Sequence, residues 1–410
     1  MKSLNRWVYA IVGVIVLLMA GMIYSWSVMS KSIAASRPDW TSTQLSVTFT
    51  VVMAFFCLGG FIGGLMSKKV KARYYILAAG ILIFIGFFVA SMTKDSPATL
   101  YLGFGVLCGL GAGFAYNGTM GTISAWFPDK QGLISGILLM GFGLSSFIVG
   151  KIFAAAAPSD GSDAWASFYR IFGIVILVLM IVCSFFVVRP GEDFKPPQGN
   201  SKKVVREPAS DVNTATMIRQ PSFWLMYVWA IMVSAAGLAL VGQASGIATQ
   251  VGTTASDGTI ATVVGMISIM NGIGRVIYGA MYDKVGYRLT MLVDMISFFI
   301  AAAILILALK SGAFILIILG FLVGGFAYGG VTPMQSAVVS DFYGRTYYSV
   351  NFSVIVTNLL IGSFASTIAG KLYDMSQSYM STIYMMFLVT AVSVVAWALL
   401  RRPGEGKKKK

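Results

Sequence analysis

The sequence contains no histidine, only three cysteines and little charge: of its 410 residues 11% are charged, whereas 57% are hydrophobic. The absence of histidine removes the usual proton carrier at neutral pH and the commonest ligand of transition metals. Cys57, Cys108 and Cys183 lie within apolar stretches, without metal-ligand spacing, and we interpret them as packing residues. The composition therefore predicts no metal and no cofactor, and any proton coupling has to use carboxylates or the substrate itself.

The apolar residues occur in long continuous blocks. Each block has about 20 residues or more, the length that a helix needs to cross about 30 Å of hydrocarbon. An outer-membrane β-barrel is excluded, because its strands alternate apolar and polar residues over about 10 positions. The first block, 7–33, is longer than the apolar core of a signal peptide and is expected to remain as a helix. The fold class is thus an all-α membrane protein.

Proline, glycine and charge clusters divide the chain into twelve candidate helices. Six lie on each side of the one long hydrophilic segment, which predicts a bundle at 1–189, a linker at 190–221 and a second bundle at 222–410. The expected helices are 7–33, 41–66, 72–92, 98–126, 132–156, 167–189, 222–249, 258–282, 289–309, 313–340, 347–370 and 378–400.

Lysine and arginine are unevenly distributed between the loops. The two termini and the loops after even-numbered helices hold 22 of the 30 basic residues. The positive-inside rule then predicts a multi-pass protein of the cell inner (plasma) membrane with both termini in the cytoplasm. This orientation explains the net charge of +15 better than nucleic-acid binding, which needs a basic face on a soluble module. The basic run 407–410 is expected to contact the lipid bilayer, and no obligatory protein partner is inferred.

Two motifs repeat between the halves. The sequence RPGE occurs at 189–192 and 402–405, and the loop at 124–130 has a counterpart at 340–345. The similar offsets, 213 and about 215 residues, indicate duplication of a six-helix unit. Repeated halves predict a binding site near the midplane between them and alternating access by rocking.

Other motifs resemble a known family. The segment 279–288, GAMYDKVGYR, resembles the loop signature of the major facilitator superfamily, whereas its partner at 64–73 lacks the aspartate and the second glycine. YSW at 24–26, WFPDKQG at 126–132 and NGIGR at 271–275 resemble the branch of oxalate/formate exchangers and monocarboxylate transporters. The resemblance implies the twelve-helix major facilitator fold, with two pseudo-symmetric bundles, and the transport of small carboxylates.

Arg275 is the only basic residue deep within a predicted helix. An intramembrane charge costs about 2.5–3.5 kcal/mol on insertion scales. Its planar guanidinium matches a carboxylate with two parallel hydrogen bonds, and glycines at 272, 274 and 279 leave space around it. We expect Arg275 to bind the substrate, with snorkelling to the cytoplasmic interface as the alternative.

The resemblance also implies what the pocket lacks. Oxalate exchangers have a second cation, a lysine in helix 11, and the aligned residue here is Asn358; a single cation favours a monocarboxylate. Animal monocarboxylate transporters have an aspartate where Asn271 stands and a lysine where Val28 stands. Asn271 lies four residues before Arg275 and so on the same helix face, but an amide cannot take up a proton.

Further residues complete the predicted pocket. Asn117 in helix 4, beside Tyr116, can donate to a carboxylate or a hydroxyl without adding charge. Tyr328 in helix 10 is the equivalent candidate from the second half, with packing between close helices as its alternative. Tyr24 and Asn358 are pocket candidates of second rank.

Two acids within helices are candidates for proton coupling. Asp257 lies at the outer end of helix 8, about 27 Å from Arg275 along an ideal helix. Asp294 lies about two turns into helix 9, and we favour a role there as an interfacial partner of a loop cation. Lys31 is interpreted as a charge at the outer interface.

These observations favour a secondary active transporter of small monocarboxylates such as lactate or pyruvate, working by proton symport. The alternative is exchange of oxalate for formate or a similar pair. An enzyme would need clustered acids, bases or nucleophiles, and the helices contain only isolated acids. A sensor would usually carry an added soluble domain, and a primary pump would need a P-loop, which the sequence lacks.

Overall fold

The computed structural model describes residues 5–66, 70–127, 131–191, 209–344 and 346–404. Twelve helices in these ranges are long and apolar enough to cross a membrane, so all twelve expected helices are confirmed. The largest shift of a helix end is at the eleventh, which ends at Ser376 rather than at 370. Several features discussed above lie outside the described residues, namely 68–69, 128–130, most of the linker (192–208), Arg345 and the basic tail (405–410).

Two spans in the first half of the chain, the first and the fourth, are not regular α-helix throughout. The first span consists of two α-helices joined by a short 3₁₀ segment, and the fourth contains a π-helical stretch, η2, near its start. The elements are α1 (Arg6–Ala20), η1 (Gly21–Ser25), α2 (Trp26–Ser36), α3 (Ser42–Met66), α4 (Ala72–Ala90), α5 (Ala98–Leu100), η2 (Tyr101–Cys108), α6 (Gly109–Ile123), η3 (Ser124–Trp126), α7 (Gln131–Ala156) and α8 (Ala164–Ser184).

The second half has a similar order, and its eleventh span is divided at Thr357. Its elements are α9 (Thr214–Met217), α10 (Pro221–Val251), α11 (Asp257–Val285), α12 (Tyr287–Ser311), α13 (Phe314–Tyr343), α14 (Tyr348–Val356), α15 (Asn358–Ser376) and α16 (Met380–Leu399).

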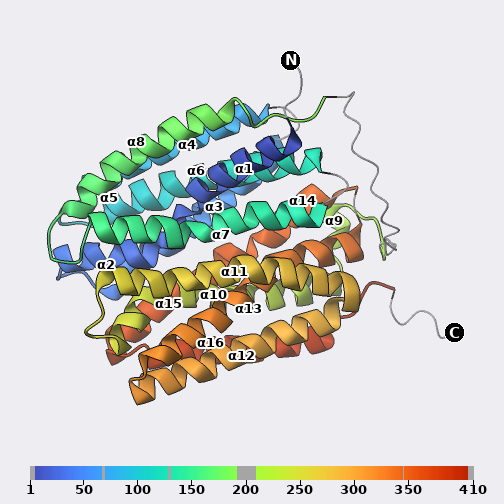
Figure 1. Ribbon diagram of the computed structural model, residues 1–410. Coiled ribbons are helices and arrows are strands. Elements are labelled where there is room, and N and C mark those ends of the chain that lie inside the picture. The colour runs from blue at the N-terminus through green and yellow to red at the C-terminus, as the bar shows by residue number, and fades with distance from the viewer. Residues whose placement is uncertain (1–4, 67–69, 128–130, 192–208, 345, 405–410) are drawn as a thin grey trace.

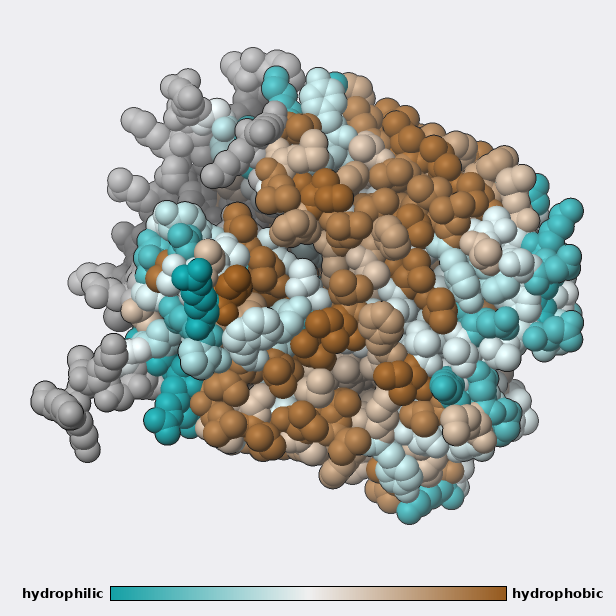
Figure 2. All heavy atoms as spheres, turned by 180° about the vertical axis from the view of Figure 1, so that it is seen from behind, coloured by the Kyte–Doolittle hydropathy of each residue, from teal (hydrophilic) through white to brown (hydrophobic). Residues whose placement is uncertain are grey.

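A broad band of apolar side chains covers the middle of the molecule, with polar residues at both ends (Figure 2). Large apolar side chains of the spans are strongly exposed: Ile171 on α8 is 64% exposed and Leu388 on α16 is 63% exposed. Such a continuous apolar surface is unfavourable in water and suits the hydrocarbon of a bilayer. The chain is therefore a multi-pass membrane protein.

The two halves form separate bundles that face each other (Figure 1). They meet mainly through α7 against α11 and α3 against α15. An offset of about 214 residues relates α3 to α11 and α7 to α15, so these two contacts are equivalent under the repeat. Twelve spans bring both ends of the chain to the same end of the bundle, here named the terminal end, and the opposite end is named the distal end (Figure 1).

The repeated motifs hold each half together at the terminal end. In the first half, Trp126 Nε1 donates to the carbonyl of Val188, directly before the RPGE motif, at 2.7 Å. In the second half, Arg402 of the RPGE motif donates to Asp341 at 2.8 Å, and the Tyr282 hydroxyl donates to the same carboxylate at 3.1 Å. The contact of Trp126 ties the end of the fourth span to the end of the sixth. The contact of Arg402 ties the end of the tenth span to the end of the twelfth. The sequence repeat thus corresponds to a repeated structural contact.

Polar contacts between the halves gather toward the distal end in the described part of the chain. Lys31 Nζ lies 2.6 Å from Asp257 Oδ1, and Asp257 Oδ2 accepts from the Ser159 amide at 2.8 Å. Asp374 accepts from the amides of Ser42 and Thr43, at 3.0 and 2.9 Å, and so caps the first turn of α3. Both acids bridge the two halves, so the distal end is closed in this conformation.

One further ion pair at the distal end lies within the first half. Arg37 donates to both carboxylate oxygens of Asp163, at 2.7 and 3.2 Å. These hydrogen bonds lower the pKa of the Asp163 carboxyl below its ordinary value. The pair joins the end of helix 1 to the start of α8, so it holds the first half together and does not bridge the two halves.

We expect Asp374→Ala to open the distal end. Loss of a helix-capping acceptor costs about 1 kcal/mol, which corresponds to roughly a fivefold shift in a two-state equilibrium. The probe is Ser46→Cys, because Ser46 is 5% exposed and lies between the halves. Its labelling rate by a maleimide in detergent should rise about fivefold in Asp374→Ala and stay unchanged in Asp39→Ala, a change of an exposed acid at the same end. Equal rates in all three backgrounds would mean that Asp374 does not hold this end closed.

Candidate functional site

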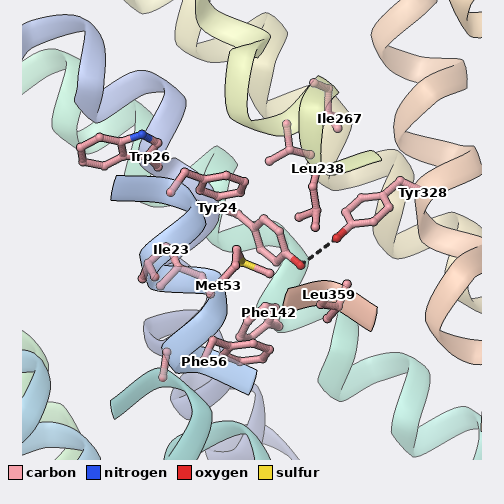
Figure 3. Close-up of a cluster of buried hydrophobic side chains, with 14 of the residues drawn as sticks. Ile23, Tyr24, Trp26, Met53, Phe56, Phe142, Leu238, Ile267, Tyr328 and Leu359 are labelled. Carbon is pink, nitrogen blue, oxygen red and sulfur yellow. Dashed lines mark hydrogen bonds between the residues drawn. The ribbon is translucent and has the colours of Figure 1, made fainter. Parts of the chain in front are cut away.

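A hydrogen bond between two tyrosines crosses the centre of the molecule. The hydroxyls of Tyr24 and Tyr328 lie 3.2 Å apart, and both side chains are buried. Figure 3 shows the two hydroxyl groups facing each other, with Phe142, Met53 and Leu359 around them. Because Tyr24 belongs to the first half and Tyr328 to the second, this bond connects the halves at the level of the predicted pocket.

Close helix packing positions both tyrosines. Tyr24 lies in the 3₁₀ segment η1, where a Cβ at Gly21 would come within 2.1 Å of the Phe142 carbonyl oxygen. The ring of Tyr328 lies on Gly237 of α10, where a Cβ would come within 2.1 Å of the ring. Only glycine permits such approaches, so these glycines fix where the two rings meet.

Arg275 lies beside this tyrosine pair on α11. It is 7% exposed, and its Nε donates to Asn271 Oδ1 at 2.9 Å. No carboxylate lies within ion-pairing distance of Arg275 in the part of the chain that the structure describes. The guanidinium is therefore held by a neutral amide one helical turn away, and its charge stays uncompensated.

The helix that carries Arg275 is locked against the helix that carries Tyr328. A Cβ at Gly274 would lie 2.3 Å from the Phe326 carbonyl oxygen, and a Cβ at Gly329 would lie 2.3 Å from the Asn271 carbonyl oxygen. The backbones of α11 and α13 thus touch on both sides of the site. Arg275, Asn271 and Tyr328 therefore form one rigid group within the second half.

A small cavity lies between the halves at this place. Its volume is about 10 Å³, close to the minimum that holds one water molecule. Three of the predicted pocket residues line it, and Arg275 adjoins it through Asn271. The lining residues are Tyr24, Gly143, Val241, Ile267, Ser268, Asn271 and Tyr328. A carboxylic acid of several heavy atoms does not fit, so the structure represents a closed conformation of the site.

Tyr116 and Asn117 lie in the first half beyond the tyrosine pair. The ring of Tyr116 packs on Phe142 with centroids 5.5 Å apart, and Phe142 packs on Tyr24 with centroids 5.4 Å apart. The amide of Asn117 donates to the carbonyl of Gly60 in α3. Neither residue lines the cavity in this conformation, and Tyr116 is connected to it through Phe142.

Asn358 uses its polar atoms within the second half. Its Oδ1 accepts from Ser234 at 2.7 Å, and its Nδ2 donates to the carbonyl of Ile355 at 2.6 Å and to Gln335 at 3.2 Å. The next residue, Leu359, is the one that faces the tyrosine pair (Figure 3). The structure does not bring Asn358 to the cavity.

The two acids predicted as proton-coupling candidates have different surroundings. Asp257 lies at the distal start of α11, as expected, and is paired with Lys31. The expectation that Asp294 pairs with a loop cation at the interface was wrong. Asp294 is 0% exposed, and neither of its oxygens has a hydrogen-bond partner. The reason is that α11 and α13 cover it, although it lies only about two turns from the start of α12.

Asp374, which bridges the halves at the distal end, was not predicted from the sequence. The repeat offset was the signal that could have found it, because 214 residues before Asp374 stands Asp160, next to the Ser159 that contacts Asp257. Asp160 and Asp374 therefore occupy equivalent positions at the distal ends of α7 and α15.

The described chain thus forms two facing bundles of six spans each, with a small cavity between them. The family model of the Major Facilitator Superfamily matches residues 7–367 and 244–410, and the chain belongs to that superfamily. It is accordingly a transporter and not an enzyme.

The chain is similar to transporters of small carboxylates. It is 27% identical to the oxalate:formate antiporter of Oxalobacter formigenes, over 97% of this chain and 93% of that protein. It is 23% identical to monocarboxylate transporter 13 of Rattus norvegicus, over 93% of this chain and 83% of that protein. Among solved structures, a bacterial homologue of the human lysosomal transporter Spinster, in an inward-facing and unoccupied conformation, matches with a TM-score of 0.70 and 13% identity, covering 96% of this chain and 95% of that one.

Asn358→Lys is expected to destabilise the protein without raising the uptake of oxalate relative to lactate. The lysine has no acceptor for the Ser234 hydroxyl, at about 1–3 kcal/mol for a buried group left unsatisfied, and adds a buried charge. The measurements are the thermal midpoint in detergent and the ratio of oxalate to lactate uptake, each compared with Leu359→Lys, which puts the cation at the centre. A stable Asn358→Lys protein with a raised oxalate ratio would show that Asn358 belongs to the substrate pocket.

Proposed function

We propose that this chain carries small monocarboxylates of the lactate or pyruvate class across the inner (plasma) membrane by alternating access, together with a proton. The buried, uncompensated charge of Arg275 is the observation that carries the proposal. An anion that pairs with it replaces hydration that the closed site excludes, and the forked guanidinium favours a carboxylate. The similarity to carboxylate transporters supports the same substrate class.

The number of cations near the cavity favours a single negative charge. No lysine or arginine is among the residues that line the cavity in the described part of the chain, and Arg275 adjoins it through Asn271. A dianion such as oxalate would keep one charge unpaired between apolar walls, and this is strongly unfavourable. A monocarboxylate forms a neutral pair with Arg275, so the loaded site carries no net charge.

Substrate entry requires the halves to separate at the centre. The cavity of about 10 Å³ has to grow, and the bond between Tyr24 and Tyr328 has to open. Both hydroxyls then become available to the oxygens of the substrate. Because the rigid group of Arg275, Asn271 and Tyr328 moves with the second half, rocking of the halves changes its distance to Tyr24.

Exchange of one carboxylate for another is the second candidate, and the similarity to the oxalate:formate antiporter favours it. An empty carrier has to move the unpaired charge of Arg275 through the closed state, whereas a loaded carrier moves a neutral pair. Counterflow in proteoliposomes with labelled lactate, pyruvate, formate and oxalate distinguishes the candidates. Our proposal expects lactate or pyruvate to exchange fastest and oxalate slowest; fast oxalate–formate exchange without lactate transport contradicts it.

Replacement of Arg275 by lysine should weaken lactate binding about 10- to 100-fold, because one charge-assisted hydrogen bond contributes about 1.5–3 kcal/mol. The lysine keeps the charge but loses the fork. Affinity is measured by calorimetry on purified protein, with Arg170→Lys as the control at an exposed arginine of α8. If Arg275→Lys and Arg275→Gln both bind lactate like the parent, the substrate site lies elsewhere.

Asn271→Asp should make lactate binding depend on pH. An aspartate in this position accepts the hydrogen bond from Arg275 Nε as a carboxylate and so competes with the substrate. We expect affinity to fall about tenfold at neutral pH and to recover as the introduced carboxyl is protonated at lower pH. Calorimetric titrations at several pH values measure this. A variant that binds like the parent throughout would show that Asn271 does not orient Arg275.

A further inference from the structure

Asp294 is a buried acid that does not line the closed cavity. It lies on α12, where its side chain is 0% exposed and both carboxyl oxygens have no hydrogen-bond partner. A Cβ at Gly330 would lie 2.6 Å from Asp294 Oδ1 and 2.6 Å from the ring of Tyr278. The carboxyl group therefore lies in a narrow space between α11, α12 and α13.

The neighbours of Asp294 offer no compensating charge. From α11, Tyr278 is the titratable side chain that faces it, and the Tyr278 hydroxyl is bonded to Ser297 at 2.9 Å. From α13 it meets Gly330. The other packed helices carry Tyr384 on α16, which is 53% exposed, and Tyr227 on α10, which is bonded to Thr357. No cation pairs with Asp294 in the described ranges.

An ionised carboxylate without partners in such a place costs many kcal/mol, so the group takes a proton. It can lose this proton only when water or a cation reaches it. Both require a shift of α11 or α13 against α12, since these two helices cover the carboxyl.

The same two helices carry the proposed substrate site. Arg275 lies three residues before Tyr278 on α11, and Tyr328 lies two residues before Gly330 on α13. A substrate that pairs with Arg275 and separates Tyr328 from Tyr24 acts on the two helices that close the space around Asp294. The repeat offset leads from Asp294 to Ala79 or Gly80, so the acid is not part of the duplicated scaffold.

We propose that Asp294 is the proton-binding site of this carrier, protonated in the closed conformation and ionised when α11 and α13 move. This inference rests on the proposed function, because it names the group that carries the proton of the symport. Arg275 binds the anion on α11, and Asp294 binds the proton on α12.

The test compares Asp294→Asn, which mimics the protonated acid, with the parent and with the exposed-acid control Asp95→Asn. In the parent and the control, an inward gradient of one pH unit should accumulate lactate about tenfold at 1:1 coupling. In Asp294→Asn accumulation should fall to onefold, while lactate counterflow stays within about twofold of the parent. Gradient-driven accumulation that survives in Asp294→Asn overturns the inference.

A second measurement does not depend on transport. Infrared spectra of the purified parent at neutral pH should contain the carbonyl band of a protonated carboxylic acid, and this band should be missing in Asp294→Asn. A parent without the band, or a variant that keeps it, contradicts the assignment. The two hypotheses fail differently: a parent without lactate counterflow refutes the proposed function, whereas intact counterflow with unchanged proton coupling in Asp294→Asn refutes only the role of Asp294.

Discussion

Arg275 keeps a permanent positive charge inside the membrane, and its one hydrogen-bond acceptor in the described chain is the neutral amide of Asn271. A folded protein tolerates a buried charge when something else compensates it. In this transporter no residue of the described ranges compensates it, and we propose that a ligand does. Three features determine when a ligand reaches that charge: the closed cavity, the hydrogen bond between Tyr24 and Tyr328 beside it, and the packing of α11 on α13.

The glycines explain how such a site stays rigid. Between α11 and α13 the backbones touch at Gly274 and Gly329, so Arg275 and Tyr328 have little freedom relative to each other. The halves pack on each other along α7 with α11 and along α3 with α15, and single polar bonds such as Tyr24 to Tyr328, Ser159 to Asp257 and Ser42 to Asp374 join them. Two rigid halves that meet along two equivalent helix pairs suit a rocking motion. The Asp294 site lies inside the second half, where the joined pair of α11 and α13 covers it, so it responds to a shift of this pair against α12.

The sequence predicts the twelve spans well, because the length of an apolar block is set directly by the thickness of the bilayer. Arg275 is equally visible, since a charge in an apolar block is costly and conspicuous. The pairing of Tyr24 with Tyr328 is not visible, because the two residues are 304 positions apart and their contact depends on how the two halves meet. Asn358 shows a related limit: alignment transfers a residue to a helix, but one residue of register decides whether Asn358 or Leu359 faces the centre. The burial of Asp294 is not visible either, because the helices that cover it, α11 and α13, are separate segments of the chain.

The central claim is that the empty carrier lacks one negative charge and that the substrate supplies it. The most direct measurement leaves the protein unchanged and alters the ligand: calorimetric binding of lactate and of lactamide, its neutral amide, to the carrier in lipid nanodiscs. The account predicts that lactate binds at least about 10-fold more tightly than lactamide, because only the carboxylate forms the charged, bidentate pair with Arg275. Equal affinity for the two compounds would contradict it.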